Sequence, residues 1–135
     1  MDLDGTITQD NNALGYADKD SNLEVIVTMR LYRDLGYTIL IYSARNVQTY
    51  NASVGKINAF TLPVIIEWLQ RHNVPYDEIH VGKPWCGTDG FYVDDRAIRP
   101  SEFTSLSPEQ VSILIGQQPN TTGGGSVAEP ERIPP

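Results

Sequence analysis

The chain has 135 residues, of which 40% are hydrophobic, and a formal net charge of −7. This length suits one domain around a single core, and the acidic balance disfavours broad binding to nucleic acid or to an anionic membrane. The single cysteine, Cys86, excludes an internal disulfide. We see no signal peptide and no membrane-spanning stretch, so we expect a cytoplasmic protein.

The first half of the chain is expected to alternate between strand and helix. Residues 1–4 are predicted to be the end of a strand, and residues 8–22 are polar and predicted to be a loop. Residues 23–35 carry apolar side chains at helical spacing, and Gly36 follows as a C-terminal cap. The continuous β-rich run over 37–42 predicts a strand that is buried on both faces, as in a parallel sheet.

The second half is expected to continue this alternation. The predicted elements are, in order, a polar loop over 47–58, a helix over 60–72, a short strand over 78–81, a loop over 85–90, a strand over 91–93 and a helix over 108–116 that begins with a capping box. This order implies an α/β domain with a mainly parallel sheet over residues 1–116. The composition of residues 117–135 turns to Pro, Gly, Thr and Ser, which predicts a disordered tail.

Polar residues stand at the carboxyl end of each predicted strand: Asp2 and Asp4, Ser43, Lys83, and Asp94 and Asp95. In an open parallel sheet these ends share one edge, where ligands bind, so we expect the residues to converge. Carboxylates suit a hard cation such as Mg²⁺, and a lysine with a hydroxyl suits phosphate oxygens. One carboxylate can attack phosphorus, while another exchanges protons with the leaving group and water.

These stretches, in this order, resemble the motifs of the haloacid dehalogenase superfamily of phosphatases: Asp2-x-Asp4-Gly5-Thr6, Ser43, Lys83 and Asp94-Asp95. The resemblance covers residues 1 to about 103. The surroundings of these motifs further resemble the small branch of capsule-biosynthesis phosphatases. The resemblance implies a HAD-like (Rossmannoid) three-layer domain with a mainly parallel sheet.

The resemblance also implies a role for each matched residue. Asp2 would be the nucleophile, and Asp4 would be the acid and base. Ser43 would hold a phosphoryl oxygen, and Lys83 would neutralise the nucleophile and the phosphate. The implied Mg²⁺ site would be built from the aspartates: Asp2, Asp4 through its backbone carbonyl, Asp94, and Asp95 through a metal-bound water or a contact behind the ligands.

Further substrate contacts are expected next to Ser43. Arg45 is expected to bind substrate or to pair with a nearby aspartate, and Asn46 follows it directly. Lys56 is a candidate sugar or phosphate contact, with a solvated loop as the alternative. The segments 8–22 and 46–58 are too short for a cap domain, so we expect a capless enzyme. Specificity would then come from loops, the bulk of the substrate, or a partner subunit in a homo-oligomer.

The predicted function is a Mg²⁺-dependent phosphomonoesterase that acts through an aspartyl-phosphate on a small phosphorylated metabolite. A sugar phosphate of capsule or surface-polysaccharide synthesis is the substrate that the resemblance suggests. A nucleic-acid-end or nucleotide phosphatase is an alternative, which the acidic charge disfavours. A phospho-accepting receiver domain would place its acidic pair before the acceptor, and a catalytically dead interaction module would not need the complete motif set.

The first strand is short, because only Met1 precedes Asp2. The superfamily normally has several apolar residues there and places this strand near the centre of the sheet. We therefore expect either that the natural strand begins earlier or that this chain is a weakened relative.

Overall fold

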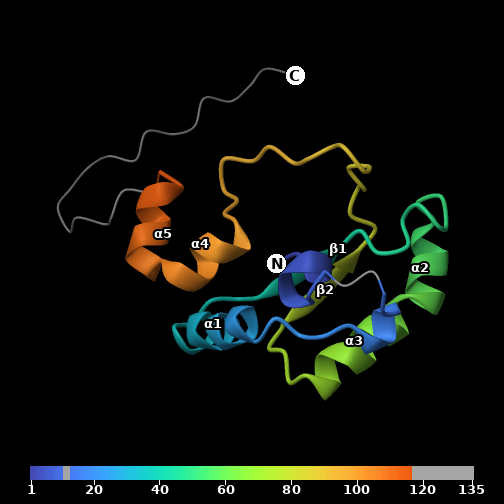
Figure 1. Cartoon of the computed structure of the whole chain (residues 1–135), viewed down its shortest axis with the longest axis horizontal. Helices are drawn as coiled ribbons and strands as arrows, with labels where there is room; N and C mark the ends of the chain where they lie inside the picture. The colour runs from blue at the N-terminus through green and yellow to red at the C-terminus, as the bar shows by residue number, and fades with distance from the viewer. Residues whose placement is uncertain (11–12, 117–135) are drawn as a thin grey trace.

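A computed structural model describes residues 1–10 and 13–116 of the chain (Figure 1). Its helices are α1 (Leu23–Asp34), α2 (Val54–Phe60), α3 (Leu62–Arg71), α4 (Pro100–Ser105) and α5 (Pro108–Leu114), and its strands are β1 (Leu40–Ser43) and β2 (Glu78–Val81). Short turns at Leu3–Ile7 and Tyr16–Asp18 precede α1. This element order confirms an α/β fold. The predicted disordered tail over 117–135 lies outside the described residues.

The sheet is parallel. β1 pairs with β2 from Leu40 opposite Glu78 to Ser43 opposite Val81. On the other edge of β1, Asp2 forms a parallel bridge with Tyr42. In the described part of the chain the first segment therefore lies at an edge of the sheet, and not at its centre as expected.

β1 is buried on one face only. Ile41 and Ser43 are buried, whereas Leu40 and Tyr42 on the opposite face are 40% and 43% exposed. Ile41 belongs to the hydrophobic core, to which α1 and α3 contribute six residues: Val25, Ile26, Met29, Ile65, Trp68 and Leu69. The prediction that this strand is buried on both faces is wrong, because the helical core covers the Ile41 face and leaves the Tyr42 face open. A third layer is not seen among the described residues.

The helices near the core largely follow the sequence pattern. α1 ends before Gly36, whose φ of +96° is favourable only for glycine, as the predicted cap requires. The predicted helix over 60–72 corresponds to α3, but the segment predicted as a loop over 47–58 also contains α2. The Ser53 side chain accepts a hydrogen bond from the Lys56 backbone N–H at the start of α2. Ser53 lies within the polar segment that was predicted to be a loop, so its capping role was not recognised from the sequence.

Residues 82–99, which we call the 82–99 segment, connect β2 to α4 and contain no regular element. Figure 1 shows this segment as a yellow-to-orange arch above the sheet. The strand predicted over 91–93 is absent, and Phe91 and Val93 are 79% and 89% exposed. A β-rich run forms a strand only when another strand supplies its hydrogen-bond partners, and the described sheet supplies none here.

The two C-terminal helices are short. The sequence pattern did not predict α4, although Glu102 caps it by accepting a hydrogen bond from the Arg99 backbone N–H. α5 confirms the predicted helix and its capping box, in which Ser107 and Gln110 exchange side-chain to backbone hydrogen bonds. Across the described ranges, none of the helices is long and apolar enough to cross a membrane.

Candidate functional site

Charged and hydroxyl side chains gather where the parallel segments end. We call this set the polar edge, and it consists of Asp2, Asp4, Lys19, Ser43, Arg45 and Lys83. Ser43 is the last residue of β1, and Lys83 follows β2 by two residues. A hydrogen bond of 3.1 Å from the Lys83 backbone N–H to the Ser43 carbonyl oxygen joins the two strand ends. The predicted convergence is thus confirmed for three of the four groups of residues.

The turn after Asp2 orients its carboxylate. The Thr8 backbone N–H closes this turn on the Leu3 carbonyl oxygen at 3.0 Å. Gly5 has a φ of +79° inside it, which a residue with a side chain adopts only under strain. Thr6 then donates its hydroxyl proton to Asp2 Oδ2 at 3.1 Å. The Asp-x-Asp-Gly-Thr order therefore has a local structural reason.

Asp2 is accessible to solvent and has a cationic neighbour. Its side chain is 41% exposed, and its Oδ1 lies 3.6 Å from Lys83 Nζ. The Lys83 side chain is only 18% exposed. An incoming anion could therefore reach both groups at once, which is the arrangement that a carboxylate nucleophile beside a phosphate would need.

Asp4 is held by two cations. Arg45 binds both carboxylate oxygens, with Nε to Oδ2 at 3.0 Å and Nη2 to Oδ1 at 2.8 Å, and Lys19 Nζ lies 3.7 Å from Oδ1. The Arg45 side chain is 1% exposed, and the Tyr16 ring lies 4.3 Å from its guanidinium carbon. The prediction that Arg45 binds substrate is not supported, because its guanidinium group is buried and binds Asp4. The alternative, pairing with a nearby aspartate, is confirmed.

Ser43 is a buried member of the polar edge. The residue is 2% exposed, and its Oγ accepts a hydrogen bond of 3.1 Å from the Arg45 backbone N–H. A hydroxyl that accepts one hydrogen bond still has its own proton to donate. The Ser43 hydroxyl keeps a proton to donate, but the residue is buried, so its contact with a phosphoryl oxygen stays a prediction.

Asn46 and Lys56, both predicted to bind substrate, lie outside the polar edge. Asn46 Oδ1 accepts a hydrogen bond from the Thr61 hydroxyl at 2.8 Å, and its Nδ2 donates to Thr49 Oγ1 at 3.2 Å. These contacts join the segment after β1 to the start of α3 and give Asn46 a structural role. Lys56 is exposed on α2, so the structure adds no support for either substrate contact.

The predicted Mg²⁺ ligands are not brought together. Asp94 and Asp95 are exposed in the 82–99 segment, where Asp94 Oδ1 accepts a hydrogen bond from the Arg96 backbone N–H at 2.8 Å. Within residues 1–10 and 13–116, no group of three or more His, Cys, Asp or Glu side chains could hold a metal ion. The residues as placed do not fit the predicted site, because the strand that was to carry Asp94 and Asp95 to Asp2 is not formed.

Two residues were missed from the sequence: Lys19, which belongs to the polar edge, and Tyr16, which covers it. Lys19 is 7% exposed, although it lies in the polar loop between Asp18 and Asp20. Its carbonyl oxygen accepts a hydrogen bond of 2.8 Å from Trp68 Nε1, which anchors the loop to α3. Tyr16 covers Arg45 from the same loop. A lone lysine among aspartates was the available signal, but only the packing on Trp68 shows that it is buried.

Loss of solvent shifts the pKa of two groups, the Tyr92 hydroxyl and the Met1 amine. It raises the pKa of the Tyr92 hydroxyl, and the neighbouring Cys86 raises it further. This hydroxyl donates a hydrogen bond to the Pro84 carbonyl oxygen. Burial also lowers the pKa of the Met1 amine, which donates to the Leu40 carbonyl oxygen at 2.7 Å. The amine is thus directed to β1.

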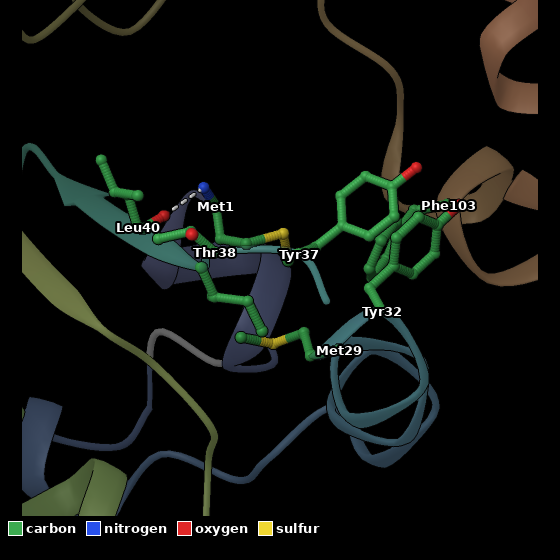
Figure 2. A pocket seen from close by; sticks show the side chains of 8 residues that line it. Met1, Met29, Tyr32, Tyr37, Thr38, Leu40 and Phe103 are labelled. Carbon is green, nitrogen blue, oxygen red and sulfur yellow. Dashed lines mark hydrogen bonds between the residues drawn. The ribbon is translucent and has the colours of Figure 1, made fainter. Parts of the chain in front are cut away.

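A separate hollow lies at the other end of β1 (Figure 2). It has a volume of about 300 Å³ and an apolar lining to which Met1, Tyr32, Tyr37 and Phe103 contribute. Tyr32 meets Tyr37 edge-on at 5.0 Å and stacks on Phe103 at 5.2 Å, measured between ring centroids. This hollow contains none of the predicted site residues, so the chemistry of the polar edge is not located there.

No family model matches the chain, and no curated protein matches it. A crystal structure of a structural-genomics target protein from Vibrio cholerae is similar to it, with 57% sequence identity and a TM-score of 0.82 over 84% of this chain and 92% of that one. The name of that protein states no activity. Because identity of this size extends over nearly the whole of the other protein, the chain belongs to the same family as this Vibrio cholerae protein.

Proposed function

We propose that the chain is a cytoplasmic phosphomonoesterase of the haloacid dehalogenase type. The observation that carries the proposal is the meeting of Asp2 and Lys83 at 3.6 Å beside the end of β1, where Ser43 lies. A carboxylate, an ammonium group and a hydroxyl from three separate segments are the groups that phosphoryl transfer through an aspartate requires.

In the proposed reaction, an Asp2 oxygen forms a bond to phosphorus while the bond from phosphorus to the leaving oxygen breaks. Asp4 gives a proton to the leaving oxygen, and it then takes a proton from the water that attacks the aspartyl-phosphate. This second attack releases phosphate and regenerates the Asp2 carboxylate. To reach the leaving oxygen, Asp4 must exchange at least one of its hydrogen bonds from Arg45, which makes Arg45 a support of the acid and base.

Dependence on Mg²⁺ and a HAD-like three-layer sheet are parts of the same proposal. The metal site needs Asp94 or Asp95 near Asp2, and the sheet needs a further strand, so both need a placement of residues 93–99 other than the exposed one. The large exposure of Val93 supports such a change, because burying this side chain would be favourable by about 1.5–3 kcal/mol. The ion would supply charge neutralisation at the phosphoryl oxygens.

The proposed substrate is a small phosphorylated metabolite, with a sugar phosphate of surface-polysaccharide synthesis as the first candidate. The accessible Asp2 carboxylate supports a substrate that arrives from open solvent. The net charge of −7 disfavours a nucleic-acid substrate.

A panel of phosphate monoesters tests this function. Sugar phosphates, nucleotides and an aryl phosphate should be incubated with the protein and Mg²⁺, and released phosphate should be measured. We expect turnover of at least one sugar phosphate and a phosphoenzyme that hydroxylamine cleaves, because acyl phosphates react with it. Absence of both turnover and phosphoenzyme over the whole panel would contradict the proposal.

We further propose a homo-oligomer in which the 46–58 segment lies near the interface, because a capless site needs other surfaces to select its substrate. Light scattering at assay concentrations tests this point. A fully active monomer would contradict it.

A further inference from the structure

The Lys83 ammonium group lies close to two aromatic rings as well as to Asp2. Its Nζ is 4.5 Å from the centroid of the Tyr92 ring and 5.7 Å from that of the Tyr42 ring. Both distances fall within the range of about 6 Å over which a cation is attracted to a ring face. Asp2 Oδ1 is the third neighbour, at 3.6 Å. Lys83 is thus surrounded by one anion and two rings.

The two rings come from different parts of the fold. Tyr42 belongs to β1, lies opposite His80 in the sheet and meets the His80 ring edge-on at 6.4 Å. Tyr92 belongs to the 82–99 segment, and its hydroxyl donates to the Pro84 carbonyl oxygen, one residue after Lys83. This hydrogen bond ties the Tyr92 ring to the backbone beside the lysine. The strand and the segment therefore meet at the Lys83 side chain.

We propose that Tyr92, with Tyr42 as a weaker second contact, is a positioning residue that holds the Lys83 ammonium group at Asp2. A lysine side chain has four flexible carbons and a compact charge, so without lateral contacts it samples many rotamers. The Tyr92 ring attracts the ammonium group, and its hydrogen bond to Pro84 keeps the ring beside the lysine. The shorter distance to Tyr92 makes this ring the stronger of the two.

For the reaction, this inference rests on the proposed function. A phosphoryl group that reaches Asp2 would meet an ammonium group already in place, so less ordering is needed when the anion binds. Loss of the ring should then weaken the binding of inorganic phosphate, the product, and lower kcat/KM to a similar extent.

The chemical reactivity of Lys83 tests the positioning without any assay of turnover. Reductive methylation with formaldehyde, followed by mass spectrometry of the peptides, gives the rate at Lys83 relative to the exposed Lys56 in the same molecule. We expect Tyr92→Leu to raise this ratio about two- to five-fold, which corresponds to the loss of one partly exposed cation–π contact. Tyr92→Phe keeps the ring but loses its hydrogen bond to Pro84, so its ratio should lie between those of wild type and Tyr92→Leu. Phe91→Leu, a change at an exposed neighbour, should stay close to wild type.

A ratio for Tyr92→Leu equal to that of wild type would overturn the inference, as would equal ratios for the Leu and Phe variants, because the ring would then not be what holds the lysine. Tyr42→Leu should raise the ratio by a smaller factor. Isothermal titration calorimetry with inorganic phosphate should show a two- to five-fold weaker affinity for Tyr92→Leu, and a smaller loss for Tyr92→Phe. If the wild-type protein neither binds phosphate nor turns over any ester, the proposed function fails, while the methylation ratio still decides the positioning.

Discussion

The polar edge and the part of the 82–99 segment that follows Lys83 both carry residues predicted for one site, but they are held very differently. At the polar edge, Arg45 binds both carboxylate oxygens of Asp4. The Lys83 backbone N–H donates a hydrogen bond to the Ser43 carbonyl oxygen at the end of β1. In the 82–99 segment, the Asp94 carboxylate accepts a hydrogen bond from the backbone N–H of Arg96, two residues away. The first region is fixed by contacts between residues distant in the chain, and the second by local ones.

The difference shows that the position of a charged motif depends on whether the strand before it forms. Ser43 and Lys83 reach the edge because β1 and β2 pair in parallel. Asp94 and Asp95 do not reach it, because the run before them has no strand partner among the described residues. Strand pairing therefore separates the residues that converge from those that do not.

The largest effect is expected from Asp2→Asn, which should reduce the turnover of an aryl phosphate to background because an amide cannot form the phosphoenzyme. Asp4→Asn should slow turnover strongly and let phosphoenzyme accumulate, since the water is then not deprotonated. Asp18→Asn, an exposed change in the loop over 8–22, is the matched control and should be active. Turnover like that of wild type in Asp2→Asn would refute the assignment of the nucleophile.

The second largest loss of activity is expected from removal of the metal. EDTA should silence the enzyme, Mg²⁺ should restore it, and Ca²⁺ should not, because Ca²⁺ takes more ligands in a looser geometry. Asp94→Asn should raise the Mg²⁺ concentration needed for half-maximal rate, whereas Asp89→Asn in the same segment should not. Full activity in metal-free buffer would exclude the metal from the mechanism and leave the 82–99 segment without a role in it.

Substitutions in the core and in the 82–99 segment should change the free energy of unfolding by clearly different amounts. Ile41→Ala, at a fully buried position, should lower the free energy of unfolding by about 2–5 kcal/mol. Val93→Ala, at a position 89% exposed, should lower it by less than about 0.5 kcal/mol in metal-free buffer. Urea unfolding followed by circular dichroism measures both. A loss above about 1 kcal/mol for Val93→Ala would show that this run packs as a strand in solution, as the HAD-like arrangement requires.

The smallest of these effects should come from the ion pair behind the site. Arg45→Met leaves the Asp4 carboxylate with Lys19 alone, and we expect a loss of about 2–3 kcal/mol in unfolding free energy, because Asp4 is partly open to water. Arg96→Met, at an exposed arginine, should change it by less than about 0.5 kcal/mol. Equal melting temperatures for the two variants would contradict the structural role of the Arg45–Asp4 pair.

The sequence by itself determined the elements whose signals are local. The apolar spacing in α1 and the glycine after it predicted that helix, the capping box predicted α5, and the run before Gly82 predicted β2 at its observed bounds. The glycine of the Asp-x-Asp-Gly-Thr stretch is a further local feature, since Gly5 adopts the positive φ that the turn after the first segment needs. Each of these features depends on residues a few positions apart.

The tertiary structure alone decided which residues meet. Arg45 could have faced a substrate or an aspartate, and burial beside Tyr16 and Asp4 chose the aspartate. Lys19 looked like a solvated loop residue until the hydrogen bond from Trp68 to its backbone buried it. The run before Asp94 had the composition of a strand, but a strand exists only through a partner elsewhere in the chain. Pairing, burial and charge compensation are long-range properties, which the local pattern of residues does not contain.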